Sequence, residues 1–433
     1  MIRLLQISDI HFNETSGDDD KYAQMKCKFL EDIADCQSKK GKIDYVLICG
    51  DIAFSGFETQ YKEANVFIEK ICEITECEKN NVFVVPGNHD KKRDVYSHTR
   101  SLLREPLQNV KNTNKLIESR MKEPMAIVLL YAPFMQYYTF ASNYSCISDI
   151  ASKASAFSES GQGMVSLPKF DAYDKMFWSE QIRDIQGIPV FIHGSNSSIL
   201  SDNYDDEHMQ VLPLQAYNVT TSRKQIHIFM LHHPMNKITE GDKIERIIDS
   251  RFQLQLYGHM HNQSSSDNGA IKIYSGALQP SEADEASKYF PIYNILEMDV
   301  AEDNGSLFLK VDVYCRKWDG TKFIEYMEET KLGENALKVE LPQNDEWAKT
   351  IERLKKGETI PEEQNETNPV VYPHAVKYNF LHSKQEKRII KAMYNDRFDN
   401  ISPNRIKYLT FLKQVEADGR INELNNNLRR YGK

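Results

Sequence analysis

The sequence predicts an α/β fold in which parallel strands alternate with helices. Three short apolar runs, at residues 3–7, 45–49 and 81–85, have the length of buried strands. Between them, residues 21–38 and 59–74 place their apolar side chains at the spacing of one helix face. This order implies parallel pairing through right-handed crossovers, so that the carboxyl ends of these strands lie at the same edge of a sheet.

Further strands are predicted after a stretch of different character. From about residue 96 to residue 179 the chain is rich in aromatic and long polar residues, which predicts helices and loops between core strands. The run Glu302–Gly305 predicts a hairpin turn, because Asn-Gly favours the tight turns that join antiparallel strands. The strands expected after the aromatic stretch are at residues 188–193, 225–231, 253–257, 270–275, 293–299 and 307–314.

The aromatic stretch is expected to form a helical cap over about residues 97–185. Aromatic residues at helical spacing usually pack against one another, so we expect this cap to have a small core of its own. The alternative is that its rings stack on a nucleic-acid base or shape a pocket.

A chain of 433 residues is too long for one core of ordinary size. We expect a main domain over residues 1–340, a helix and a proline-containing linker over 341–373, and a basic helical module over 374–433. This last module has 13 basic and six acidic residues, a formal charge of +7, whereas the whole chain carries −9. We expect it to contact the acidic body of the chain or a protein partner, with nucleic acid as the third option.

Composition excludes several classes of protein. No run of 18 apolar residues is present, so no membrane span is expected. The seven cysteines are odd in number and form no CxxC pair, which argues against a disulfide framework and a thiolate zinc site. The N-terminus does not have the pattern of a secretory signal. We therefore expect a cytoplasmic protein with free thiols.

Histidines and acidic residues gather at the predicted strand ends, where open α/β sheets bind their ligands. Asp9 and His11 can point to the same side, because positions two apart in an extended chain do so. A carboxylate such as that of Asp51 can bridge two cations. Oxygen and nitrogen donors suit Mn, Fe or Zn. The candidate metal ligands are Asp9, His11, Asp51, Asn88, His232, His259 and His261.

Two cations about 3.5–4 Å apart hydrolyse phosphate esters by polarising the phosphoryl oxygen and activating a bridging water. His89 is the candidate proton donor to the leaving group, and Asp90 is expected to orient it from behind. Asn88, His89 and Arg93 are the candidate substrate-binding residues. The run Lys91–Arg93 has two open interpretations, a phosphate clamp or a solvated turn.

These motifs together resemble the calcineurin-like metallophosphoesterase superfamily. The resemblance covers roughly residues 1–315, and its motif sequences are most similar to those of class III cyclic-nucleotide phosphodiesterases and their bacterial relatives. The blocks that carry it are Asp9-Ile10-His11, Gly50-Asp51, Gly87-Asn88-His89-Asp90, His232-His233-Pro234 and Gly258-His259-Met260-His261.

The resemblance implies a four-layer αββα sandwich with a binuclear centre of two divalent cations, Mn first, and Fe or Zn as alternatives. One cation would be held by Asp9, His11, Asp51 and His261. The other would be held by Asp51, Asn88, His232 and His259. His89 would contact the substrate phosphate. The histidine pair leaves open whether His232 or His233 is the ligand, with His232 favoured.

The expected function is metal-dependent hydrolysis of phosphate esters, by a phosphodiesterase or nuclease acting on a nucleotide or nucleic acid. A phosphomonoesterase is the first alternative. A non-catalytic scaffold that binds a protein partner is the second, and the presence of every expected ligand argues against it.

Overall fold

The computed structural model describes residues 1–13, 22–93, 119, 123–159, 167–171, 174–201, 209–279, 290–344 and 347–357, with seven positions between 393 and 424. The chain separates into two compact units, Met1–Ile360 and Pro361–Lys433. None of the helices in the described residues is long and apolar enough to cross a membrane. The basic segment expected to be helical over 374–433 lies almost wholly outside the described residues.

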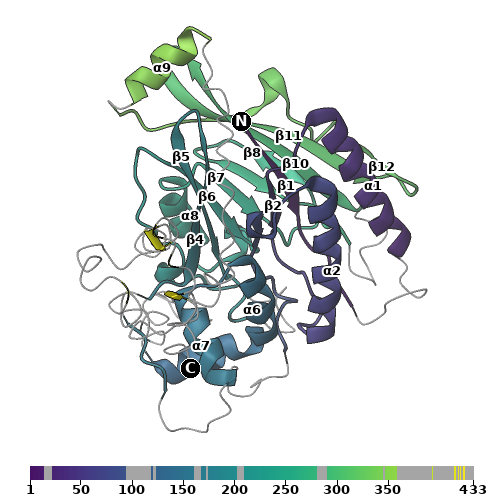
Figure 1. Cartoon of the computed structure of the whole chain (residues 1–433), viewed down its shortest axis with the longest axis vertical. Coiled ribbons are helices and arrows are strands. Elements are labelled where there is room, and N and C mark those ends of the chain that lie inside the picture. Colours follow the sequence, from purple (N-terminus) through teal and green to yellow (C-terminus); the bar gives the residue numbers. More distant parts are fainter. Residues whose placement is uncertain are drawn as a thin grey trace. The chain divides into compact units, whose positions relative to one another are not determined.

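The first sheet contains the three N-terminal strands in the predicted parallel order. Strands β1 (Ile2–Ile7) and β2 (Tyr45–Ile48) pair in parallel, as do β2 and β3 (Val82–Val84), while β10 (Ile292–Asp303) runs antiparallel to β1. The connecting helices α1 (Ala23–Lys40) and α2 (Glu58–Thr75) pack on each other beside this sheet (Figure 1). In spatial order the strands are β12 (Phe323–Glu325), β11 (Ser306–Trp318), β10 (Ile292–Asp303), β1 (Ile2–Ile7), β2 (Tyr45–Ile48) and β3 (Val82–Val84), with β13 (Leu337–Glu340) on β11.

The second sheet holds four parallel strands with one antiparallel strand at each edge. Helix α8 (Gly241–Asp249) connects two of the parallel strands, β6 (Ile226–Leu231) and β7 (Leu254–Tyr257). In spatial order the strands are β4 (Phe177–Ile185), β5 (Ile188–Ser195), β6 (Ile226–Leu231), β7 (Leu254–Tyr257), β9 (Ile271–Tyr274) and β8 (Ser264–Ser266).

Two mixed sheets with helices confirm the α/β class and the expected αββα sandwich. Strands β1, β2 and β3 are buried along their whole length. Strands covered on both faces need apolar side chains at every position, which is why they appear in the sequence as continuous apolar runs. The hairpin between β10 and β11 is also confirmed, because Asn304 and Gly305 both have the positive φ of a tight turn.

The aromatic stretch differs from its prediction in two ways. Its helices are α5 (Pro124–Tyr131), α6 (Met135–Ala141) and α7 (Asp149–Glu159), but β4 occupies the end of the range that was expected to be helices and loops. The rings also do not form a separate core. Phe140 lies 5.1 Å from the ring of Tyr61 on α2, and both belong to the main hydrophobic cluster. These buried rings therefore pack in the main core, and Tyr137 and Tyr138 also line a small pocket.

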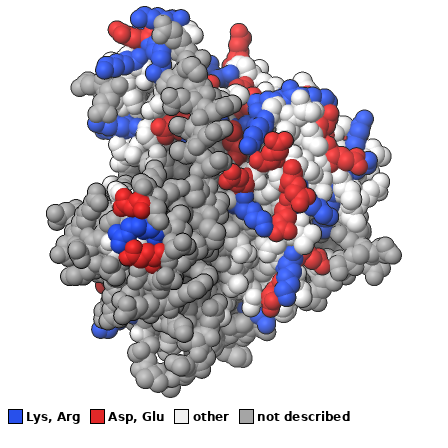
Figure 2. All heavy atoms as spheres, in the orientation of Figure 1, with Lys and Arg blue, Asp and Glu red and all other residues white. Residues whose placement is uncertain are grey.

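A helix also follows residue 341, as expected: α9 spans Ala348–Lys355. On the face shown in Figure 2, acidic and basic side chains of the described residues are interspersed. Helices α1 and α2 illustrate this with ion pairs one turn apart, such as Lys39 with Asp35 and Lys62 with Glu58. This face therefore has no broad basic surface among its described residues.

Candidate metal centre

The candidate ligands come from both sheets, and each follows the carboxyl end of a strand. Asp9 and His11 follow β1, and Asp51 follows β2. Asn88 follows β3 in the first sheet, whereas His232 follows β6 in the second. His259 and His261 follow β7, next to β6. The structure therefore places all seven residues at one edge where the two sheets meet.

Asp51 lies at the centre of this arrangement. Its Oδ2 atom is 3.3 Å from His11 Nε2 and 3.3 Å from His232 Nε2. Asn88 Oδ1 lies 3.1 Å from the same His232 nitrogen. On the other side, Asp9 Oδ1 lies 3.2 Å from Nε2 of His261. The Asp51 carboxylate thus lies between His11, which is grouped with Asp9 and His261, and His232, which is grouped with His233 and His259.

Backbone strain is concentrated in these same residues. Left-handed φ angles of 50–68° occur at Asp9, His11, Asp51, His259 and His261, which are five of the ten described non-glycine residues with positive φ. Such a conformation costs about 1–2 kcal/mol per residue. Hydrogen bonds from Asp9 N to Gly50 O and from His11 N to Asp51 O help to hold it. Strain of this kind typically collects where side chains must point into a functional site.

Two glycines allow the chain to pass close to the central carboxylate. A Cβ atom at Gly87 would overlap Oδ1 of Asp51 and lie 2.5 Å from its backbone nitrogen. At Gly50, where φ is 96°, a Cβ would overlap the ring of His232. Both glycines of the GD and GNHD blocks are therefore required by space, and Gly50 is required by its positive φ as well.

The outer ring nitrogens of two histidines are held by backbone carbonyl groups. Nδ1 of His232 donates to Cys49 O at 2.8 Å, and Nδ1 of His11 donates to Gln279 O at 3.0 Å. In the neutral ring this places the proton on Nδ1 and the lone pair on Nε2, which faces Asp51. This is the ring form that binds a metal, and an outer hydrogen bond of this kind commonly selects it.

The electrostatics of the centre keep its carboxylates ionised. Burial raises the pKa of Asp51, but the neighbouring His232, His89 and His11 outweigh it and hold this pKa well below its usual range. Burial likewise raises the pKa of Asp9, while contact with His261 lowers it to a net value of about 2. Burial lowers the pKa of His232, but Asp51 raises it to about 9. The buried negative charge thus attracts positive charge at this point.

The donor set fits a pair of divalent cations. Asp9 Oδ1 is buried and has no well-aligned hydrogen-bond donor among the described residues, although His261 is close. Carboxylate and amide oxygens together with imidazole nitrogens suit divalent metals such as Mn, Fe or Zn. Four groups of three side chains bring their ligand atoms within 4.8 Å of one another, and Asp51 belongs to two of these groups.

A family model described as calcineurin-like phosphoesterase matches residues 2–263, more than half of the chain. The chain belongs to the calcineurin-like phosphoesterase family. This confirms the resemblance on which the αββα fold and the binuclear centre were expected. The family binds divalent metals, and the described residues supply side chains for that purpose at the expected place.

Comparison with individual proteins adds to the family assignment. The chain is 25% identical over 321 residues to an uncharacterized metallophosphoesterase-like protein, YydB of Bacillus subtilis strain 168. The match covers 70% of this chain and 58% of YydB, so the chain spans little more than half of that relative.

Among solved structures, Vps29 from Entamoeba histolytica in complex with zinc matches with a TM-score of 0.30 and 12% identity, over 79% of this chain and 100% of Vps29. The NAD nucleotidase NadN from Haemophilus influenzae matches with a TM-score of 0.27 and 12% identity, over 90% of this chain and 61% of NadN. Similarities this low carry no information about substrate.

Within this family site, the expected relation between Asp90 and His89 is wrong. Asp90 is fully buried, and its carboxylate accepts N–H groups from Ile52, Ala53 and Gly87 at 2.8–3.1 Å. The ring of His89 instead donates from Nδ1 to the carbonyl oxygen of Phe54 at 2.8 Å. Asp90 therefore holds the backbone around Asp51 and Gly87, and a backbone carbonyl orients His89.

The basic run after Asp90 is neither a uniform clamp nor a solvated turn. Lys91 is 1% exposed, and its ammonium donates to the carbonyl oxygens of Ser198, Ile199 and Ser201 at 2.6–3.4 Å. The charge of Arg93, in contrast, acts on His89. Of this run, Lys91 is turned away from the candidate site, whereas the charge of Arg93 lowers the pKa of His89.

The geometry also separates the two adjacent histidines. Nε2 of His232 faces Asn88 and Asp51, whereas Nδ1 of His233 faces the hydroxyl group of Ser197. This favours His232 as the ligand. The supporting groups at Cys49 O, Gln279 O and Ser197 were not identified from sequence. Backbone carbonyls leave no pattern of residue types, and no periodicity marks Ser197 as a neighbour of a distant histidine.

Proposed function

We propose that this protein is a metal-dependent phosphoesterase that cleaves phosphodiesters. The observation that carries the proposal is the position of Asp51, whose Oδ2 lies 3.3 Å from a histidine of each of the two sheets. An oxygen in that position can bridge two cations. The cations would be held by Asp9, His11, Asp51 and His261 on one side and by Asp51, Asn88, His232 and His259 on the other.

The chemistry that such a cation pair supplies when bound is activation of a water molecule and polarisation of a phosphoryl oxygen. His89 would contribute the contact to the substrate phosphate. Because its Nδ1 already donates to Phe54 O, His89 could give the leaving oxygen a proton from Nε2 only as an imidazolium. Burial lowers the pKa of His89 to about 4, and the negative charge of a bound phosphate would favour the protonated form. The backbone N–H of His89 donates to Asp51 Oδ1 at 2.7 Å, and its ring is tethered to Phe54 O. The residue is thus held at both ends beside the shared carboxylate.

Charge favours a diester over a monoester as the substrate. A diester phosphate carries one negative charge, whereas a monoester carries about 1.5 to 2 near neutral pH. Of the basic run that follows Asp90, Lys91 is turned away and Lys92 lies over the ring of Phe57, 5.1 Å from its centroid. Arg93 remains as the residue of this run whose charge reaches His89. One guanidinium matches a singly charged phosphate.

A panel of substrates tests the proposed function. Bis-para-nitrophenyl phosphate, para-nitrophenyl phosphate, and single- and double-stranded DNA would each be incubated with Mn²⁺ and the protein. We expect turnover of the diester and its loss in Asp51→Ala. Cleavage of DNA would extend the activity to a nuclease. Turnover of the monoester alone would contradict the proposal in favour of a phosphatase. If a folded protein turned over none of these substrates with Mn, Fe or Zn, the result would favour a non-catalytic binding scaffold.

Replacement of His89 separates chemistry from metal binding. We expect His89→Ala to retain both cations and to lower the rate of diester cleavage by about 10²–10⁴-fold, the usual contribution of a positioned acid. Elemental analysis gives the metal content, and the matched control is Asp51→Ala, which should lose metal. Loss of metal in His89→Ala would show that His89 is a ligand and not a substrate contact.

A further inference from the structure

His233 follows a proposed ligand and is as deeply buried, with 1% of its surface exposed, yet the proposed centre does not use it. Its Nδ1 atom lies 2.9 Å from Ser197 Oγ, just after the end of β5. Its Nε2 atom is buried and has no hydrogen-bond partner among the described residues. An unpaired buried nitrogen costs about 1–3 kcal/mol. Such a cost suggests that the imidazole has a task at this position.

The ring of His233 packs against both of the histidines proposed for the second cation. Its centroid lies 4.9 Å from that of His232, with the two planes 85° apart, and 4.5 Å from that of His259. The three residues each bring a ring nitrogen to within 4.8 Å of the others. His233 therefore limits the directions in which the other two rings can turn.

Ser197 holds His233 at two points. Its hydroxyl oxygen accepts the backbone N–H of His233 at 3.1 Å and also contacts the ring at Nδ1. A second hydroxyl group, that of Ser198, lies 3.4 Å from the same ring nitrogen. Ser197 is fully buried, so water does not compete for these bonds.

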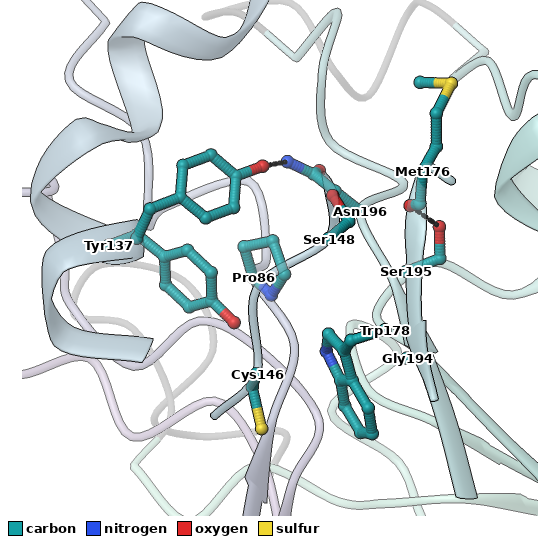
Figure 3. A pocket seen from close by; sticks show the side chains of 10 residues that line it. Pro86, Tyr137, Cys146, Ser148, Met176, Trp178, Gly194, Ser195 and Asn196 are labelled. Atoms are coloured by element: carbon teal, nitrogen blue, oxygen red, sulfur yellow. Dashed lines mark hydrogen bonds between the residues drawn. The ribbon is translucent and has the colours of Figure 1, made fainter. Parts of the chain in front are cut away.

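The loop that carries this serine is itself held from two sides. Asn196 Oδ1 accepts the backbone N–H of Ser198 at 2.7 Å, and Asn196 Nδ2 donates to the hydroxyl of Tyr138 on α6 at 2.9 Å (Figure 3). From the other side, Lys91 donates to the carbonyl oxygen of Ile199 at 3.0 Å. The loop therefore presents a fixed hydroxyl group to the histidine.

We propose that Ser197 and His233 form a brace that holds the rings of His232 and His259 in place for the second cation and thereby sets its affinity. The inference rests on the proposed two-cation site. His233 is a positioning residue in this arrangement, because it acts through its two neighbours and does not touch the substrate. Loss of an outer partner of a metal ligand typically lowers metal affinity by about 10–100-fold.

Titration of the metal-free protein with Mn²⁺ by calorimetry, with metal content by elemental analysis, tests the brace without measuring activity. We expect Ser197→Ala to weaken the second binding step by about 10–100-fold and to leave the first unchanged. His233→Phe keeps a ring but loses the bond to Ser197, and we expect the second step to weaken there too. The control is Ser195→Ala, which loses a hydrogen bond of 3.1 Å to Met176 O on the same segment (Figure 3) and should bind as wild type.

Equal affinities in Ser197→Ala and Ser195→Ala, with both proteins folded by circular dichroism, would overturn the brace. So would complete loss of one cation in His233→Phe while Ser197→Ala binds as wild type, because His233 would then be a direct ligand. Wild-type protein that binds two cations without turning over any ester would contradict the proposed function alone. If the wild-type protein bound fewer than two cations, the result would contradict both the proposed cation pair and the brace.

Discussion

At the scale of single residues, the proposed centre depends on how closely the chain approaches Asp51. Its Oδ1 accepts the backbone N–H of His89, and its Oδ2 faces His11 and His232. The backbone at Gly87 passes so close that a methyl group there would overlap the carboxylate. A single missing Cβ therefore decides whether Asp51 can lie between two cations.

Substitution of Gly87 should show this directly. We expect Gly87→Ala to displace the Asp51 carboxylate and to weaken Mn²⁺ binding at both positions, by at least the 10–100-fold that is typical for loss of an outer partner. The control is Gly320→Ala, where φ is 102° but no atom lies within 4 Å of the added Cβ. It should lower the melting temperature slightly and leave metal affinity alone. Calorimetric titration measures the Mn²⁺ affinity of both variants, and an equal affinity in the two would contradict the steric argument.

At the scale of elements, strands β5 and β6 carry a buried histidine pair away from the centre. His193 Nε2 lies 3.0 Å from His227 Nδ1. Burial lowers the pKa of His227 to about 4, and burial together with His227 and Lys175 lowers that of His193 to about 3. Both rings stay neutral in the folded protein, whereas an unfolded chain would protonate them below about pH 6.5. This pair has a structural role, and it lowers the stability of the folded protein at acidic pH.

The sign of the pH dependence follows from these lowered pKa values. Above pH 6.5 both states are neutral and the pair has no effect, while between pH 6.5 and 4 the unfolded state binds more protons and stability falls. We expect the melting temperature to drop over this range. His227 donates from Nδ1 to His193, because its Nε2 accepts the backbone N–H of Ser222. His227→Asn keeps an N–H donor near the Nδ1 position but cannot titrate, so its fall in melting temperature on acidification should be smaller. Thermal melts of both proteins between pH 7.5 and 4.5 provide the measurement. An equal fall in melting temperature in the two proteins would exclude this histidine pair as a cause of the acid sensitivity.

At the scale of the whole molecule, the centre joins the two sheets. Asp9 and Asp51 come from the first sheet, and His232 and His261 come from the second. Across this junction, His232 already donates to Cys49 O. Two buried carboxylates repel each other unless positive charge lies between them. A bound cation would relieve that repulsion and connect side chains of both sheets.

Metal should therefore stabilise the fold as well as serve the reaction. A cation at 100 times its dissociation constant adds about 2.7 kcal/mol per site if the unfolded chain does not bind it. We expect Mn²⁺ to raise the melting temperature and a chelator to reverse the rise. Asp51→Ala should lose most of this response, as measured by differential scanning fluorimetry. A response of equal size in wild type and variant would place the bound metal elsewhere.

The sequence by itself determined most of the core strands, the parallel pairing of the first three and the polar residues that follow them, but not β4, β8, β12 or β13. Runs such as Arg3–Ile7 and the blocks that follow them are local patterns, and local patterns report local structure. It did not determine how the side chains meet. That Asp90 holds backbone N–H groups, that Lys91 turns away, and that the aromatic rings join the main core were all decided by contacts between distant segments.

The distinction between His232 and His233 shows the physical reason. The two residues are adjacent and identical in type, so no pattern along the chain separates them. Packing of the second sheet against the first brings one ring to Asn88 and Asp51, and the end of β5 brings a serine to the other. Those partners lie 36 or more residues away along the chain, where the periodicity of a single element carries no information.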